Sequence, residues 1–167
     1  MYTWYLATPQ NPFLHVLVAK GWFAGWGDIL FGIVSLVLVG GSPWRLILFP
    51  LLTLAGAAVM VSCGFIYHSL SFFWGKSEAF SGQLFESLLT FSLWPGEIFP
   101  PALRVLFFTV IPAGFVAYLP VRLLTRFSWS AFLGLFGAAA LAVFLAKSIF
   151  GLGLRRYESG NLVAMRD

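Results

Sequence analysis

Charged residues are scarce in this sequence. Of its 167 residues, 10 are Lys or Arg and 6 are Asp or Glu, which makes 10% charged, whereas 60% are hydrophobic. A soluble domain carries about 25% charged residues on its hydrated surface. The mean hydropathy of +0.91 points the same way. The composition therefore excludes an ordinary soluble domain and predicts an integral membrane protein.

Residues that carry metal, redox or nucleotide chemistry are also rare. Cys63 is the single cysteine, and the two histidines, His15 and His68, have no partner at the spacing of a metal site. The sequence Gly-Lys-Ser at 75–77 lacks the upstream glycine of a phosphate-binding loop. There is no basic stripe of the kind that binds nucleic acid. We therefore expect no cofactor, no metal, no nucleic-acid partner and no ATP hydrolysis by this chain.

The sequence contains long runs of residues that carry no charge. The run from Leu46 to Phe73 contains no Lys, Arg, Asp or Glu, and about twenty apolar residues suffice to cross a bilayer. Tryptophans, which prefer the headgroup layer, lie near the edges of the apolar blocks. On this pattern we expect spans at 22–39, 44–74 and 129–150, with a Gly-Gly-Ser-Pro breaker at 40–43.

The segment from Lys76 to Trp94 has a different pattern. Polar or small residues recur every four positions, and Leu and Phe cover the other surface. Four-residue spacing places such side chains on one helical face. We expect this face to meet protein or water and the Leu and Phe side chains to meet lipid. The predicted pathway or interface residues are Glu78, Gly82, Glu86 and Thr90.

The segment from Ile98 to Leu124 is long enough for one span but rich in proline. Pro112 and Gly114 fall near its middle, where they weaken helical continuity. A turn there predicts a re-entrant pair of half-helices, and a kinked single span is the alternative. We thus expect an all-α membrane protein with about four spanning helices plus a Pro-rich re-entrant helical pair before the last span.

The chain ends flank this membrane domain, which we expect at 21–154. Residues 1–20 contain Pro9 and Pro12, which interrupt a long helix, and 155–167 form a polar tail. The positive-inside rule weakly favours the side of Lys20, Lys76 and Arg155 as cytoplasmic.

Several motifs in this order resemble those of a known family. They are the runs Leu93–Pro100, Val110–Phe115 and Tyr118–Pro120, and the closing run Gly153–Asn161 with its Arg-Tyr-Glu-Ser-Gly. Together they resemble the permease subunits of ABC-2 type exporters, in the six-span bacterial subgroup. Members of that subgroup extend further at the amino end, so the chain is similar to the carboxy-terminal two-thirds of such a permease.

The resemblance implies a multi-pass protein of the bacterial cytoplasmic membrane with both ends in the cytoplasm. It implies a separate ATP-binding cassette ATPase as partner and a second permease subunit, in a homodimer or a heterodimer. Residues 1–20 then form a cytoplasmic coupling segment, whose turns and apolar face suit a groove on a partner. The predicted ATPase-contact residues are Pro9, Asn11, Pro12, Phe13 and Leu17.

Two other functions stay open on the sequence. One is a non-transporting membrane scaffold or assembly protein. The other is an intramembrane hydrolase, suggested by His68 beside Ser69 and Ser71, since a serine nucleophile needs a neighbouring base. Co-purification of an ATPase distinguishes the transport subunit from both, and hydrolysis by the purified chain distinguishes the enzyme.

Overall fold

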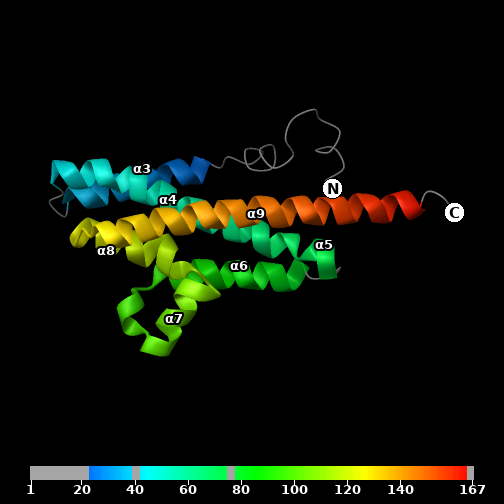
Figure 1. Cartoon of the computed structure of the whole chain (residues 1–167). Helices are drawn as coiled ribbons and strands as arrows, with labels where there is room; N and C mark the ends of the chain where they lie inside the picture. The colour runs from blue at the N-terminus through cyan, green and yellow to red at the C-terminus, as the bar shows by residue number, and fades with distance from the viewer. Residues whose placement is uncertain (1–22, 39–41, 75–77, 165–167) are drawn as a thin grey trace. The chain divides into compact units, whose positions relative to one another are not determined.

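The structure is a computed structural model that describes residues 23–38, 42–74 and 78–164. Every regular element in these ranges is helical, and the order of the helices along the chain follows the colours of Figure 1. The chain divides into two compact units, Met1–Ile47 and Leu48–Asp167. The all-α fold is confirmed.

The first unit contains helix α3, Phe23–Leu38, and the start of α4. Helix α3 is 16 residues long, about 24 Å at 1.5 Å per residue, which is slightly short of a bilayer core of about 30 Å. Its large apolar side chains are exposed, as Phe31 and Leu38 show. The expected coupling segment at 1–20 and the glycines of the breaker lie outside the described residues, and α4 begins at Pro43 as expected.

Helix α4, Pro43–Ser69, supplies six of the twelve buried residues in the core cluster of the second unit. It continues with a small offset into α5, Ser71–Trp74, and the stretch Pro43–Phe73 is long and apolar enough to cross a membrane. Its buried face repeats at helical spacing through Leu48, Leu52, Ala55, Val59 and Cys63. The expected span at 44–74 is thus a helix with one face in the core and the other face exposed.

The last helix, α9, runs from Trp129 to Ala164 without a break. Its part Trp129–Arg155 is the second candidate span of the described chain. The polar tail predicted after residue 154 continues this helix to Ala164, although Gly160 and Asn161 within it are poor helix formers. In Figure 1, α4 crosses behind α9 at an angle, and Phe65 of α4 packs edge-on against Phe150 of α9.

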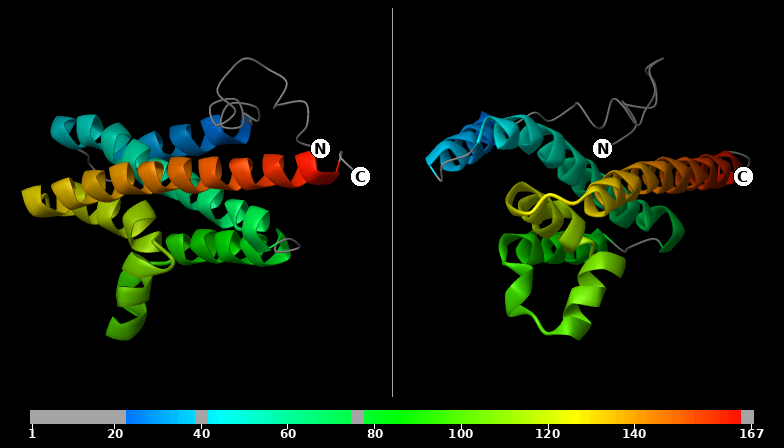
Figure 2. Two further views of the ribbon diagram at one scale, coloured as in Figure 1. Left: turned by 45° about the vertical axis from the view of Figure 1, so that its right-hand side comes forward. Right: turned by 60° about the vertical axis from the view of Figure 1, so that its left-hand side comes forward.

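Between α4 and α9 the chain forms α6, Glu78–Leu93, and then a broken helical stretch. A short turn at Gly96–Ile98 leads to α7, Pro101–Thr109, and a π-helical turn, Gly114–Tyr118, leads to α8, Leu119–Thr125. The pair on either side of the break is bent by 88°, and Figure 2 shows α7 standing steeply away from α8. The predicted Pro-rich pair before the last span is therefore present.

The number of spans agrees only roughly with the expected four. Two helices of the described chain meet the length and composition of a span, and the bent pair would be a third if it crosses as one unit. Helix α6, like α3, has 16 residues. At 1.5 Å per residue each is about 24 Å long, which is short of a bilayer core of about 30 Å.

Candidate functional site

The polar row of α6 is exposed in the second unit. Glu78, Glu86 and Thr90 are exposed, and a Cβ built on Gly82 would meet nothing within 4 Å. Successive members of the row lie four residues apart, about 6 Å along the helix axis. The row is therefore a continuous open strip, in keeping with its predicted role as a pathway or interface.

The opposite face of α6 differs from the expectation that its Leu and Phe side chains meet lipid. Leu88 is fully buried, and Leu84, Phe85 and Phe91 pack against the core cluster of the second unit. Phe85 also lies against Gly64 of α4, where its ring would be 3.2 Å from an added Cβ. The apolar face of α6 thus holds the helix in the bundle, and this leaves the polar row outward.

The predicted turn at Pro112 and Gly114 falls in the break between α7 and the π-helical turn. The backbone tightens there, since the Ala113 amide donates to the Ile111 carbonyl and the Phe115 amide donates to the Pro112 carbonyl. A Cβ on Gly114 would lie 2.6 Å from the ring of Phe108. A side chain at this position would therefore require the Phe108 ring to move aside.

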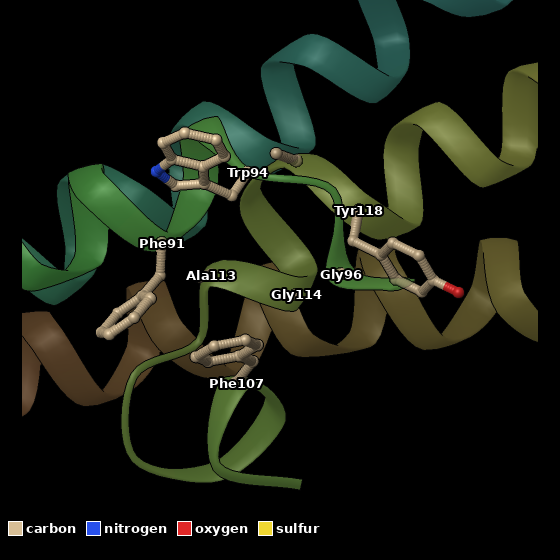
Figure 3. Close-up of a pocket in the computed structure, with 8 residues that line it drawn as sticks. Phe91, Trp94, Gly96, Phe107, Ala113, Gly114 and Tyr118 are labelled. Atoms are coloured by element: carbon tan, nitrogen blue, oxygen red, sulfur yellow. The ribbon is translucent and has the colours of Figure 1, made fainter. Parts of the chain in front are cut away.

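Aromatic rings surround this bend. Phe91, Phe99 and Phe107 pack mutually, with ring centroids 4.8–6.0 Å apart. Figure 3 shows Phe107 beneath Ala113 and Gly114, with Trp94 and Tyr118 on other sides. The cavity that remains among these residues has a volume of about 10 Å³, at the lower limit for one water molecule. The bend is a packed structural joint and has no room for a substrate.

Arg104 stabilises the turn that leads into α7 at this joint. Its Nε donates to the Phe99 carbonyl and its Nη2 to the Glu97 carbonyl, both at 2.9 Å. These carbonyls belong to the turn that links α6 to α7 and have no helical partner. The guanidinium can hold both because its donors form a rigid fork.

Two contacts of α4 with the bent segment were not predicted from the sequence. The Tyr67 hydroxyl donates to the Val110 carbonyl at 3.2 Å, which satisfies a backbone group at the break. A Cβ on Gly56 would lie 2.6 Å from the Val116 carbonyl oxygen. The run of small residues around Gly56 was the available signal, since small residues let helix backbones approach closely.

The residues considered for hydrolytic chemistry are arranged differently from a nucleophile and base. The Ser69 hydroxyl donates to the Phe65 carbonyl at 2.6 Å, and the Ser71 hydroxyl donates to the His68 carbonyl at 2.7 Å. Each hydroxyl has one proton, which is therefore directed at the backbone and away from the imidazole. Among the described residues there is no group of three metal-ligating side chains.

The four-residue spacing of Gly134, Ala138, Ala142 and Ala146 predicts a small-residue packing stripe on α9, and this stripe is only partly an internal packing face. Ala146 is fully buried, but Gly134 is exposed with open space around it. The buried positions of α9 are instead Leu135, Ala139, Ala146 and Gly153. The packing face is thus rotated from the predicted stripe, because Leu135 fills the core at the level of α8.

The comparison with known families is specific. Residues 3–161 match a family model described as ABC-2 family transporter protein, so the match covers most of the chain. No curated protein and no solved structure matches it. The matched range includes the polar row of α6 and the bent pair.

Proposed function

This chain belongs to the ABC-2 family of transporter proteins, and on that basis we propose that it is the permease subunit of an ATP-driven exporter of the bacterial cytoplasmic membrane. It is a multi-pass membrane protein with candidate spans at Pro43–Phe73 and Trp129–Arg155. The chain supplies part of the substrate pathway, and a separate ATP-binding cassette ATPase in the cytoplasm supplies the energy.

The observation that carries this proposal is the family match over residues 3–161. Two features of the second unit support it. The exposed row with Glu78 and Glu86 offers a polar strip on an otherwise apolar protein, and carboxylates at membrane depth are costly unless they face water or protein. The bent pair directly precedes the last span, and irregular backbone is tolerated at depth when it packs against protein.

In this proposal the exposed row of α6 faces either the pathway or a second permease subunit. Two copies of this chain, or this chain and a related partner, enclose the pathway. The break at Pro112 and Gly114 is the inner end of a re-entrant pair, with Arg104 and Arg122 on the outer side. Residues Pro9 to Lys20 are the cytoplasmic segment that docks on the ATPase, with Phe13 and Leu17 as its apolar contacts.

Co-purification tests the proposal. The tagged chain is co-expressed with a candidate ATP-binding cassette ATPase from the same organism, extracted in mild detergent and isolated through the tag. We expect the ATPase to be retained by the unaltered chain and by Tyr2→Asp, which places the same charge in the segment 1–20 but outside its docking part, Pro9 to Lys20. We expect Phe13→Asp to lose it, because a carboxylate cannot enter an apolar groove without a large desolvation cost.

Two results would each contradict one part of this proposal. Failure of the ATPase to co-purify with the folded, unaltered chain would favour a scaffold or assembly protein. Retention of the ATPase by Phe13→Asp at the level of Tyr2→Asp would remove the docking role of Pro9 to Lys20 while leaving the permease assignment in place.

A further inference from the structure

A groove lies between α4 and α9 of the second unit. It has a volume of about 620 Å³, is open along one side, and is lined by apolar side chains and by Lys147. Ala55 of α4 and Ala139 of α9 are buried at 4% and 7% exposure and form its floor. Leu54 and Phe144, exposed by 68% and 67%, form its sides. The volume is within the range of sites that hold small molecules.

The length of the groove matches one leaflet of a bilayer. Along α9 its lining runs from Phe136 to Lys147, which is eleven residues and so about 16 Å at 1.5 Å per residue. The hydrocarbon core of a bilayer is about 30 Å thick. A groove of this length, open to the side, fits an acyl chain that extends from the headgroup layer to the bilayer centre.

The depth of Lys147 agrees with that placement. Trp129 begins the helix and is 68% exposed, as expected for a residue at the headgroup layer. Lys147 follows eighteen residues later, about 27 Å along the axis, and therefore lies near the opposite headgroup layer. Its side chain is exposed, and no ion-pair partner for it is found among the described residues.

Lys147 is the only charged residue that lines the groove. An ammonium group at the end of an apolar groove is complementary to a molecule with an acyl chain and a negative headgroup. Lysine binds phosphate as a compact point charge, and each lysine near an anionic membrane surface contributes about 1 kcal/mol.

The charge argues against a second copy of the chain as the occupant. Permease copies related by a two-fold axis along the membrane normal present identical residues at the same depth. Packing groove against groove would therefore bring two Lys147 side chains to one level, and like charges repel. An anionic lipid fills the same space and neutralises the charge.

We propose that the groove between α4 and α9 is a binding site for one anionic glycerophospholipid, with an acyl chain along Ala55 and Ala139 and the phosphate at Lys147. The site lies on a different surface from the polar row of α6 and so goes beyond the proposed transport pathway. It makes the stability of the chain dependent on the headgroup charge of the leaflet at the Lys147 end.

Native mass spectrometry of the full-length chain in mild detergent tests this site. Phosphatidylglycerol and phosphatidylcholine with identical acyl chains are added in a titration. We expect one tightly retained lipid, with phosphatidylglycerol preferred. Lys147→Gln should lower the affinity for phosphatidylglycerol about five-fold, the loss expected for one lysine at the surface, and should leave phosphatidylcholine unchanged.

Two further variants separate the groove from general detergent or fold effects. Ala140→Phe places a ring in the groove at an exposed position and should abolish retention of both lipids. Gly134→Phe places the same ring on an exposed part of α9 outside the groove, where an added Cβ meets nothing within 4 Å, and should retain the lipid. Thermal unfolding of each variant shows that it is folded.

Several outcomes would overturn the site. Equal binding of the two lipids, or unchanged phosphatidylglycerol affinity in Lys147→Gln, would remove the role of the charge. Unchanged retention in Ala140→Phe would place the lipid elsewhere. Cysteine cross-linking tests whether protein fills the groove. If the purified protein retains no lipid and Ala140→Cys cross-links to the same cysteine of a second copy, or to a cysteine placed in α3, protein occupies the groove.

Discussion

At the scale of single residues, Gly56 is a position of α4 that the bent segment approaches closely. The obstacle there is the Val116 carbonyl oxygen, 2.6 Å from the place of a Cβ. A flexible side chain can rotate away from such a contact, but a backbone carbonyl moves only with its segment. The close approach of α4 to the π-helical turn therefore depends on the absence of a side chain at this residue.

We predict that Gly56→Ala destabilises the chain although alanine is the better helix former. Inserting a methyl group into a packed core costs about 1–3 kcal/mol, which exceeds the gain of about 1 kcal/mol from helix propensity. The thermal unfolding temperature in detergent should fall.

The matched control for this prediction is Gly134→Ala. Gly134 is also helical, but an added Cβ there meets open space, so its unfolding temperature should stay the same or rise. Equal behaviour of the two variants would show that α4 does not approach Val116 as closely as described.

At the scale of elements, the two faces of α6 have separate tasks. Leu88 is 0% exposed and belongs to the core, whereas Glu86 is exposed on the polar row. We predict that Leu88→Ala lowers the free energy of unfolding by about 2–5 kcal/mol, the range for a large core side chain cut to alanine. Glu86→Gln should change it by less than about 0.5 kcal/mol.

Transport assays then distinguish the role of Glu86 from that of a plain surface residue. If the polar row of α6 lines the pathway or a subunit interface, the Glu86→Gln variant keeps its free energy of unfolding but loses transport activity. A stable Glu86→Gln variant with full activity would exclude Glu86 from that role. Gln83→Glu, an exposed position on the same helix, serves as the control for altered charge.

The bent pair gives a second prediction at this scale. If α7 and α8 form a re-entrant pair, cysteines at Ala102 and Val121, both exposed, react with an impermeant thiol reagent added outside intact cells. The background carries Cys63→Ala, since Cys63 is the single native thiol. Reaction of position 102 only from the cytoplasmic side would make the pair one broken span.

The sequence predicts much of this element structure because the signals are local. The uncharged run after Arg45 predicted α4, the Pro43 breaker predicted its start, and the pairing of Pro112 with Gly114 predicted the break. The prediction that the Leu and Phe side chains of α6 meet lipid was wrong for a physical reason. In a membrane protein, Leu and Phe are equally suited to lipid and to the protein core. The hydrogen bond from Tyr67 to Val110 joins residues far apart in sequence and leaves no local pattern.

At the scale of the whole molecule, the chain has the parts of a transport subunit but no motif for ATP hydrolysis. Its described residues offer two candidate spans, a bent pair packed on α4, and an exposed polar strip. The apolar core of the second unit joins α4, α6, the bent segment and α9 into one cluster. A movement imposed on one of these helices is therefore passed to the others through packed side chains.

The central claim is that a separate ATPase works through this chain, and ATP turnover in proteoliposomes tests it most directly. The candidate ATPase is reconstituted alone, with the chain, and with the Phe13→Asp variant, and vanadate-sensitive ATP hydrolysis is measured in each. We predict that the unaltered chain changes the rate of hydrolysis several-fold and that Phe13→Asp returns it to the rate of the ATPase alone. Identical rates in all three preparations, with the chain folded in each, would contradict the account.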